Sequence, residues 1–183
     1  MSEMLLVVSS SKARINAPAE LIDLTGWLFN LSDSEYQACS KDHLAAASGF
    51  TREGKRLSIN VETIGGDLLV QHYVEQISDR DHCQVRSVSD AFTHFGLTKM
   101  EVTWDLTVRS IGSDSCEFEN RIEVRATPEL LSALKEHGVP PEAARPRMQS
   151  LADEHNAIET PLFAKDIERK AQAHVLRRQG SVA

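Results

Sequence analysis

His155 and Glu159 have the spacing of an acid–base pair on one side of a helix. Residues four apart meet on a helix surface, where a carboxylate favours the charged form of an imidazole. Leu151, Ile158 and Leu162 fall at the spacing of an apolar stripe, and His155 lies among them. The imidazole therefore either packs there with a hydrogen bond to the backbone or faces a cavity and contacts a ligand. The pair as a whole could equally be a surface feature.

The stretch that carries this pair is predicted to be a long C-terminal helix over residues 142 to about 173. Pro146 is an alternative start for it. Pro161 should kink the helix, because proline lacks a donor and clashes with the preceding turn. Phe163 follows the expected kink, where it could guard the mouth of a pocket or pack in the core.

Shorter helices are predicted on both sides of the middle of the chain. Thr127 is a good N-cap and Gly138 a good stop for a helix between them. Two more helices are expected over residues 19–29 and 32–39, and residues 40–48 could add a further helical turn.

The middle of the chain alternates between apolar and polar residues, as the strands of an antiparallel sheet do. In residues 55–64, Leu57, Ile59 and Val61 share one face and polar residues share the other. Gly65-Gly66 then provides a tight turn into the next strand. Six strands are predicted in total, over residues 4–15, 55–64, 67–78, 82–89, 97–112 and 116–126.

The order of these elements, with the step "INAPAELI" at residues 15–22 after the first strand, resembles the START-like or Bet v 1-like superfamily (SRPBCC), which includes polyketide cyclases and aromatases. The resemblance covers nearly the whole chain and implies one domain over residues 1–183 with an α+β helix-grip fold. In that fold a curved antiparallel sheet wraps around the long helix, and a cavity between them holds an apolar or amphipathic small molecule. The usual seventh strand is not evident, although residues 4–15 or 47–64 could contain a break that supplies it.

Strand alternation suggests which side chains would line such a cavity. It places Leu68, Val70, His72 and Val74 on the inner face of one strand and Asn120 on the inner face of another. A shift of register by one residue would turn His72 or Asn120 outward, and Trp104 could fill the core instead of stacking on a ligand. The candidate ligand-binding residues are His72, Trp104, Asn120, His155, Glu159 and Phe163.

Composition and motifs exclude several other classes of function. A net charge of −7 argues against a general nucleic-acid binder, and the apolar run at residues 4–8 is too short for stable membrane insertion. Three widely spaced cysteines without a CxxC motif fit a reducing cytoplasm and signal neither disulfides nor a thiolate metal site. The seven histidines show no HxH or HExxH motif, and no phosphate-binding loop is present, so no metal or cofactor is predicted.

Three hypotheses for function follow. The first is a protein that binds or transports an apolar or amphipathic small molecule. The second is an enzyme of cyclase, aromatase or hydratase type that uses His155 as its acid–base group. The third is a non-catalytic interaction module that uses the outer face of the sheet or the helix at residues 127–138. An open edge strand could also mediate a homodimer.

Overall fold

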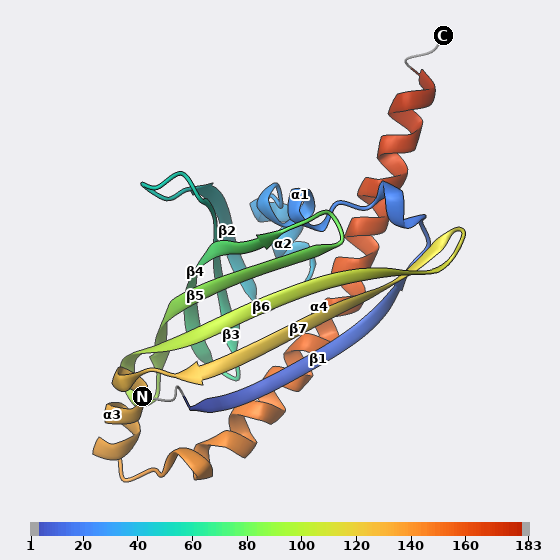
Figure 1. Cartoon of the computed structure of the whole chain (residues 1–183). Helices are drawn as coiled ribbons and strands as arrows, with labels where there is room; N and C mark the ends of the chain where they lie inside the picture. The colour runs from blue at the N-terminus through green and yellow to red at the C-terminus, as the bar shows by residue number, and fades with distance from the viewer. Residues whose placement is uncertain (1–3, 181–183) are drawn as a thin grey trace.

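A curved antiparallel sheet wraps around one long helix, α4, which crosses its concave side (Figure 1). The computed structural model describes residues 4–180, with side chains as far as residue 173. The elements in chain order are β1 (Leu5–Ile15), the 3-10 helix η1 (Ala19–Leu21), α1 (Leu24–Phe29), α2 (Asp33–Ala38), β2 (His43–Phe50), β3 (Arg56–Ile64), β4 (Asp67–Ser78), β5 (His82–Thr93), β6 (Gly96–Gly112), β7 (Ser115–Ala126), α3 (Pro128–Glu136) and α4 (Pro141–Gly180).

The strand order is β1-β7-β6-β5-β4-β3-β2, so strands β2 to β7 follow one another and β1 closes the sheet beside β7. This arrangement confirms the predicted helix-grip α+β fold. The seventh strand is β2. The end of β2, together with β3, lies in residues 47–64, one of the two stretches that were expected to contain the missing strand. The helical turn predicted at residues 40–48 is wrong for most of that stretch. Pairing with β3 overrides the helix propensity of the alanines at 45–47.

The short helices have the caps that their sequences suggest. Thr127 Oγ1 accepts a hydrogen bond from the backbone N–H of Leu130 at 3.2 Å and so caps α3. Gly138, which follows α3, has a φ of +68°, the left-handed conformation that glycine supplies at helix ends. Ser32 and Glu35 form a reciprocal capping box at the start of α2.

The long helix α4 contains both Pro146 and Pro161 and continues on either side of each. It begins at Pro141, before the alternative start at Pro146. Immediately before Pro161, Thr160 Oγ1 donates to the carbonyl oxygen of Asn156, one turn earlier, at 2.6 Å. Although α4 is long, no helix among residues 4–180 is both long and apolar enough to cross a membrane.

The main core lies between the concave side of the sheet and helices α1, α2 and α4. The face of β6 that the alternation predicts to be apolar is buried there, with Trp104 and Leu106 at its centre. Phe163 of α4 and Trp27 of α1 pack edge to face in the same core, with ring centroids 5.2 Å apart. A smaller cluster under α3 contains Leu6, Val7, Ala126, Leu130 and Leu134.

Two neighbouring strands bury the face opposite to the one predicted. On β4 the buried residues include Leu69, Gln71 and Tyr73, while His72 is exposed. The prediction that His72 lines the interior is therefore wrong. A shift of one residue turns every side chain of a strand to the opposite face of the sheet. The polar face of β3 is likewise buried: Ser58, Asn60 and Glu62 are its inward members.

The apolar stripe predicted for α4 is also misplaced. Ile158 and Leu162 are 44% and 37% exposed. The buried side of this part of the helix carries His155, Asn156, Glu159 and Thr160 instead. The sheet and the helix thus present polar faces to each other. The expectation that apolar faces turn inward fails for both elements, because the interior there is polar.

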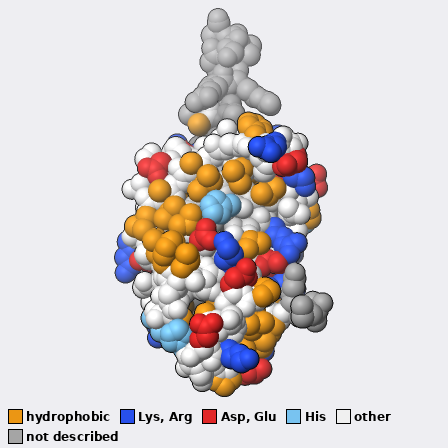
Figure 2. Space-filling model, turned by 90° about the vertical axis from the view of Figure 1, so that its left-hand side faces the viewer, with side chains coloured by type: hydrophobic (Ala, Val, Ile, Leu, Met, Phe, Trp, Pro, Cys, Tyr) orange, Lys and Arg blue, Asp and Glu red, His pale blue; other side chains and the backbone are white. Residues whose placement is uncertain are grey.

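The surface of the molecule carries charges of both signs. On the face shown in Figure 2, acidic and basic side chains are interspersed and form no continuous basic patch, while hydrophobic side chains gather in one patch at the left beside a histidine. On the outer face of β6 and β7, Arg109 pairs with Glu117 at 2.7 Å. Arg121 similarly pairs with Glu123 at 2.5 Å. The Arg109–Glu117 contact joins neighbouring strands, whereas Arg121 and Glu123 lie two residues apart on β7.

Candidate functional site

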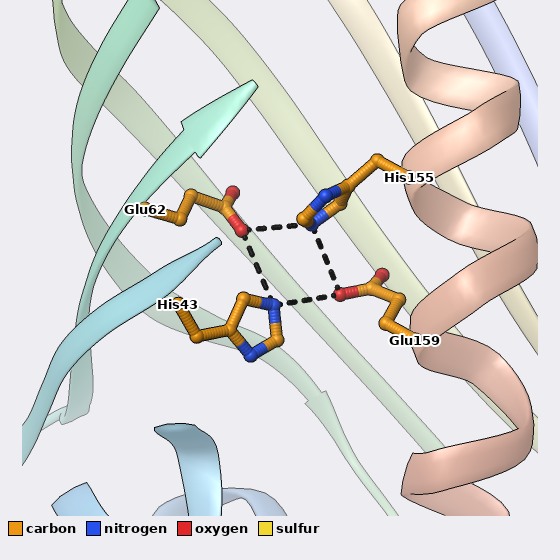
Figure 3. Close-up of side chains that lie close together, drawn as sticks. All are labelled: His43, Glu62, His155 and Glu159. Atoms are coloured by element: carbon orange, nitrogen blue, oxygen red, sulfur yellow. Dashed lines mark hydrogen bonds and ion pairs between the residues drawn. The ribbon is translucent and has the colours of Figure 1, made fainter. Parts of the chain in front are cut away.

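Four ionisable side chains meet in the interior between the sheet and α4 (Figure 3). We call His43, Glu62, His155 and Glu159 the His–Glu cluster. Each offers one ligand atom, and these atoms all lie within 4.8 Å of one another. The cluster is where the polar faces of β3 and α4 meet.

Three elements position the cluster. His43 is the first residue of β2 and lies opposite Glu62 of β3 in the register of the antiparallel pair. His155 and Glu159 project from successive turns of α4, as their spacing predicts. Residues far apart in the sequence are therefore brought together by one strand pair and one helix.

The facing atoms of the cluster form a ring of four short contacts. Glu62 Oε2 lies 3.0 Å from His155 Nε2 and 3.5 Å from His43 Nε2. Glu159 Oε2 lies 3.1 Å from His43 Nε2 and 3.3 Å from His155 Nε2. Each carboxylate thus contacts both imidazoles.

Helix α2 fixes the orientation of His43 through Tyr36. The Nδ1 atom of His43 is 2.8 Å from the carbonyl oxygen of Tyr36, and the two rings stack with centroids 3.9 Å apart. The hydroxyl of Tyr36 donates to Glu62 Oε2 at 3.2 Å. Tyr36 therefore holds members of the cluster from both β2 and β3.

A second chain of hydrogen bonds fixes Glu159 from the side of β6 and β7. Trp104 Nε1 donates to Asn120 Oδ1 at 2.7 Å, and Asn120 Nδ2 donates to Glu159 Oε1 at 2.9 Å. Asn120 is fully buried, so its amide has no alternative partner in water. Trp104 and Asn120 thus orient the carboxylate of Glu159 rather than lining an open cavity.

The contacts within the cluster change the protonation of its members. Burial opposes the charged form of His155, but hydrogen bonds to Glu159 and Glu62 outweigh it and raise its pKa above the usual value of 6.5. Burial likewise opposes ionisation of Glu159, but hydrogen bonds from His155 and His43 lower its pKa. Burial, followed by the charge of Glu62, raises the pKa of Tyr36 and Tyr73 well above 10. Both tyrosines are therefore neutral at physiological pH.

One member of the cluster, His155, lines a surface pocket of about 240 Å³. The side chain of His155 is 10% exposed, whereas that of His43 is fully buried. The pocket lies between α4 and the hairpin turn that joins β3 and β4. Its lining residues are Lys41, Asp42, Thr63, Ile64, Gly65, Gly66, Leu151, Glu154, His155 and Ile158.

Of the residues predicted to form the site, the structure brings together His155, Glu159, Asn120 and Trp104. Phe163 lies in the core beside Trp104, with ring centroids 5.8 Å apart, and is fully buried, so it guards no pocket mouth.

Sequence reasoning missed His43 and Glu62. His43 lies in the stretch expected to be a helical turn, and Glu62 lies on the strand face expected to be solvated. The pairing of β2 with β3 is the signal that would have placed them opposite each other. No metal motif is visible in the sequence because the four potential ligands come from three separate segments.

Comparisons with known proteins identify the fold. No protein-family model matches the chain. A comparison with curated proteins finds no significant match.

Solved structures do match over most of the chain. The ZhuI aromatase/cyclase from Streptomyces sp. R1128 is similar with a TM-score of 0.59 and 10% identity, over 89% of this chain and 94% of that one. A START superfamily protein from Mycobacterium smegmatis is similar with a TM-score of 0.55 and 17% identity, over 91% and 97% of the two chains. The protein TTHA0849 from Thermus thermophilus gives a TM-score of 0.55 and 14% identity, over 91% and 98%. The chain therefore has the START-like helix-grip fold.

Proposed function

We propose that this protein binds a small amphipathic molecule in the pocket at His155 and converts it there, with the His–Glu cluster as the reactive centre. The observation that carries the proposal is that the cluster is buried while one member, His155, lines a pocket open to the surface. Burying an ion costs several kcal/mol even after relaxation. Apolar residues of similar volume in place of a buried ion pair therefore often give the same or greater stability. Such clusters of perturbed ionisable groups gather preferentially at functional sites.

The pocket suggests the class of ligand. Leu151 and Ile158 offer apolar surface on one side, and His155, a member of the cluster, offers a polar group. A volume of about 240 Å³ is below the roughly 300–1,000 Å³ of sites for drug-sized ligands. The pocket therefore suits a compact molecule, or one end of a longer one, whose carbonyl or carboxylate faces His155.

The polar interior favours an enzyme over a simple carrier of apolar molecules. A carrier would gain affinity from apolar lining, whereas the faces of β3 and α4 that meet here are polar. The ZhuI protein, which shares the fold, is an aromatase/cyclase. The interaction-module hypothesis has no comparable support among the described residues.

A ligand screen with two matched variants of α4 tests this proposal. Ile158→Trp fills the pocket, whereas Leu162→Trp places the same bulk one turn further along α4, on another exposed position. We expect short-chain keto and carboxylic acids with an apolar tail to raise the melting temperature of the wild type and of Leu162→Trp. The shift should disappear in Ile158→Trp.

Conversion is tested by incubating the bound compounds with protein and analysing them by mass spectrometry. We expect product with the wild type and with Leu162→Trp, and none with His155→Gln. No melting shift across the panel, or an equal shift in Ile158→Trp, would contradict binding at this pocket. Binding without product would leave a carrier as the function.

A further inference from the structure

The facing atoms of the His–Glu cluster form a closed ring in which imidazole nitrogens and carboxylate oxygens alternate (Figure 3). We infer that His43 Nε2, Glu62 Oε2, His155 Nε2 and Glu159 Oε2 are the ligands of one divalent transition-metal ion, with Zn²⁺ as the best match. This inference deepens the proposed function and rests on it, since the ion would bind His155, which lines the pocket.

The spacing of the four atoms fits a single small cation. The four sides of the ring measure 3.0, 3.1, 3.3 and 3.5 Å. Ligands at about 2.0–2.1 Å from a tetrahedral Zn²⁺ lie about 3.3 Å from one another. The four sides are therefore close to the separation that a shared metal ion requires, and all four ligand atoms lie within 4.8 Å of one another.

The hydrogen bond of His43 aims its free nitrogen at the centre of the ring. A carbonyl oxygen can only accept, so His43 Nδ1, 2.8 Å from the carbonyl of Tyr36, carries a proton. The nitrogen that remains for a metal ion is Nε2, which faces the carboxylate oxygens of Glu62 and Glu159. Metal-binding histidines usually donate their other N–H to a backbone carbonyl or carboxylate, as His43 does.

The carboxylates are also held as metal ligands usually are. Asn120 Nδ2 binds Glu159 Oε1, which leaves Oε2 directed at the ring. The Tyr36 hydroxyl donates to Glu62 Oε2. Outer-shell donors of this kind fix the orientation of ligating carboxylates. The site therefore has both a set of four ligands and the partners that position them.

Charge and donor type point to the class of ion. Imidazoles bind a metal ion in their neutral form, so with two carboxylates the bound ligand set carries a charge of −2, which one divalent cation balances in a buried site. Both carboxylates of the cluster pair with the two imidazoles. Imidazole nitrogen suits Zn²⁺, Fe²⁺ and related ions, whereas Mg²⁺ and Ca²⁺ prefer oxygen alone.

Calorimetry with the full-length protein tests the inference without any organic ligand. The protein is stripped with a chelator, dialysed, and titrated with ZnCl₂, with MgCl₂ and CaCl₂ as controls. We expect saturable binding of one Zn²⁺ per chain and no comparable binding of Mg²⁺ or Ca²⁺. Absence of stoichiometric Zn²⁺ binding by the folded protein would overturn the inference.

Two matched variants locate the site. Glu62→Gln keeps the shape of the side chain but removes a charged ligand, so Zn²⁺ affinity should fall by more than the roughly 10- to 100-fold that loss of an outer-shell partner costs. His82→Gln removes an imidazole from another pair, in which His82 Nε2 lies 2.9 Å from Asp105 Oδ1 outside the cluster. The Zn²⁺ affinity of His82→Gln should match that of the wild type. Equal affinity in Glu62→Gln would place the metal elsewhere and contradict the inference.

X-ray absorption at the zinc edge keeps the test valid if Glu62→Gln fails to fold. The Zn²⁺-loaded wild type should show imidazole scattering from two ligands together with oxygen, at about 2.0–2.2 Å. A sulfur shell at about 2.3 Å would indicate a cysteine site and overturn the assignment.

The metal and the organic ligand are tested separately. Zn²⁺ binding that persists in Ile158→Trp, together with an unresponsive ligand panel, would support the metal site and reject the proposed small-molecule function. Ligand binding at the pocket by a protein that takes up no Zn²⁺ would reject the metal site and leave the proposed function standing.

Discussion

His43 Nε2 lies 3.1 Å from Glu159 Oε2 although 116 residues separate the two in the chain. The contact joins β2, at one edge of the sheet, to the middle of α4. Glu62 and His155 complete the ring of contacts in the His–Glu cluster. Removal of one charged member therefore leaves the others without a full set of partners. The stability of the fold therefore depends on the same residues as the proposed chemistry.

Glu159→Ala should destabilise the metal-free protein strongly. The two imidazoles lose the carboxylate that they share, and breaking a buried ion pair typically costs about 3–5 kcal/mol. Urea denaturation in the presence of a chelator measures this loss. Glu154→Ala, at an exposed position of α4, should change the free energy of unfolding by about 0.5 kcal/mol or less. Similar values for the two variants would show that the cluster is energetically unimportant.

Trp104→Phe should lower stability by leaving the Oδ1 atom of Asn120 without its donor. A buried polar group without a partner costs about 1–3 kcal/mol, and Asn120 is fully buried. Trp27→Phe is the matched control, because the hydrogen bond from Trp27 Nε1 to Asp166 is only partly buried and water can replace it. Chemical denaturation should show the larger loss for Trp104→Phe. The reverse order would contradict the proposed role of Trp104.

The ion pairs of Glu35 should make stability depend on pH in the acid range. Burial of Glu35 opposes ionisation, but hydrogen bonds from the Ser32 backbone and from Lys170 outweigh it and lower its pKa from 4.5 to about 2. Because the pKa is lower in the folded state, this stabilisation is complete above pH 4.5 and is lost as the pH falls toward 2.

We therefore expect the stability advantage of the wild type over Glu35→Gln to shrink between pH 4.5 and 2. Thermal unfolding at a series of pH values measures it. A constant difference across this range would show that Glu35 titrates at the same pH in the folded and unfolded chains.

Thr127→Ala should weaken the start of α3. The variant loses the cap on the backbone N–H of Leu130 and the hydrogen bond from Thr127 Oγ1 to the carbonyl of Lys99. Loss of an N-cap typically costs about 1 kcal/mol. Thr127→Ser keeps the hydroxyl and should retain most of the stability in urea denaturation. Equal losses in the two variants would assign the effect to the methyl group of the threonine.

The fold was largely predictable from sequence where the interior is apolar. The alternation of β6 correctly places Trp104 inside, and Thr127 and Gly138 correctly bound α3. In these elements the hydrophobic pattern, the caps and the turn residues all indicate the same structure, which is the condition under which local rules succeed.

The candidate site was predictable only in part. The spacing of His155 and Glu159 indicated a pair on one side of α4, and the predicted inward position of Asn120 is correct. His43 was missed because its stretch was expected to be a helical turn, and Glu62 was missed because apolar faces were expected to turn inward, which fails where a buried polar site replaces the core. His72 was assigned inward by the same rule and is exposed. The errors therefore concentrate around the His–Glu cluster.

The pairing of the first strand with the last also governs how the chain can fold. Ser10 of β1 contacts Glu119 of β7 across 109 residues, and β7 is the sheet neighbour of β1. During synthesis β1 leaves the ribosome before the other strands of the sheet. It stays unpaired until β7 has been made. Such long loop closure slows folding and leaves strand edges open to association. We expect the nascent chain to need protection from aggregation until residues 115–126 emerge.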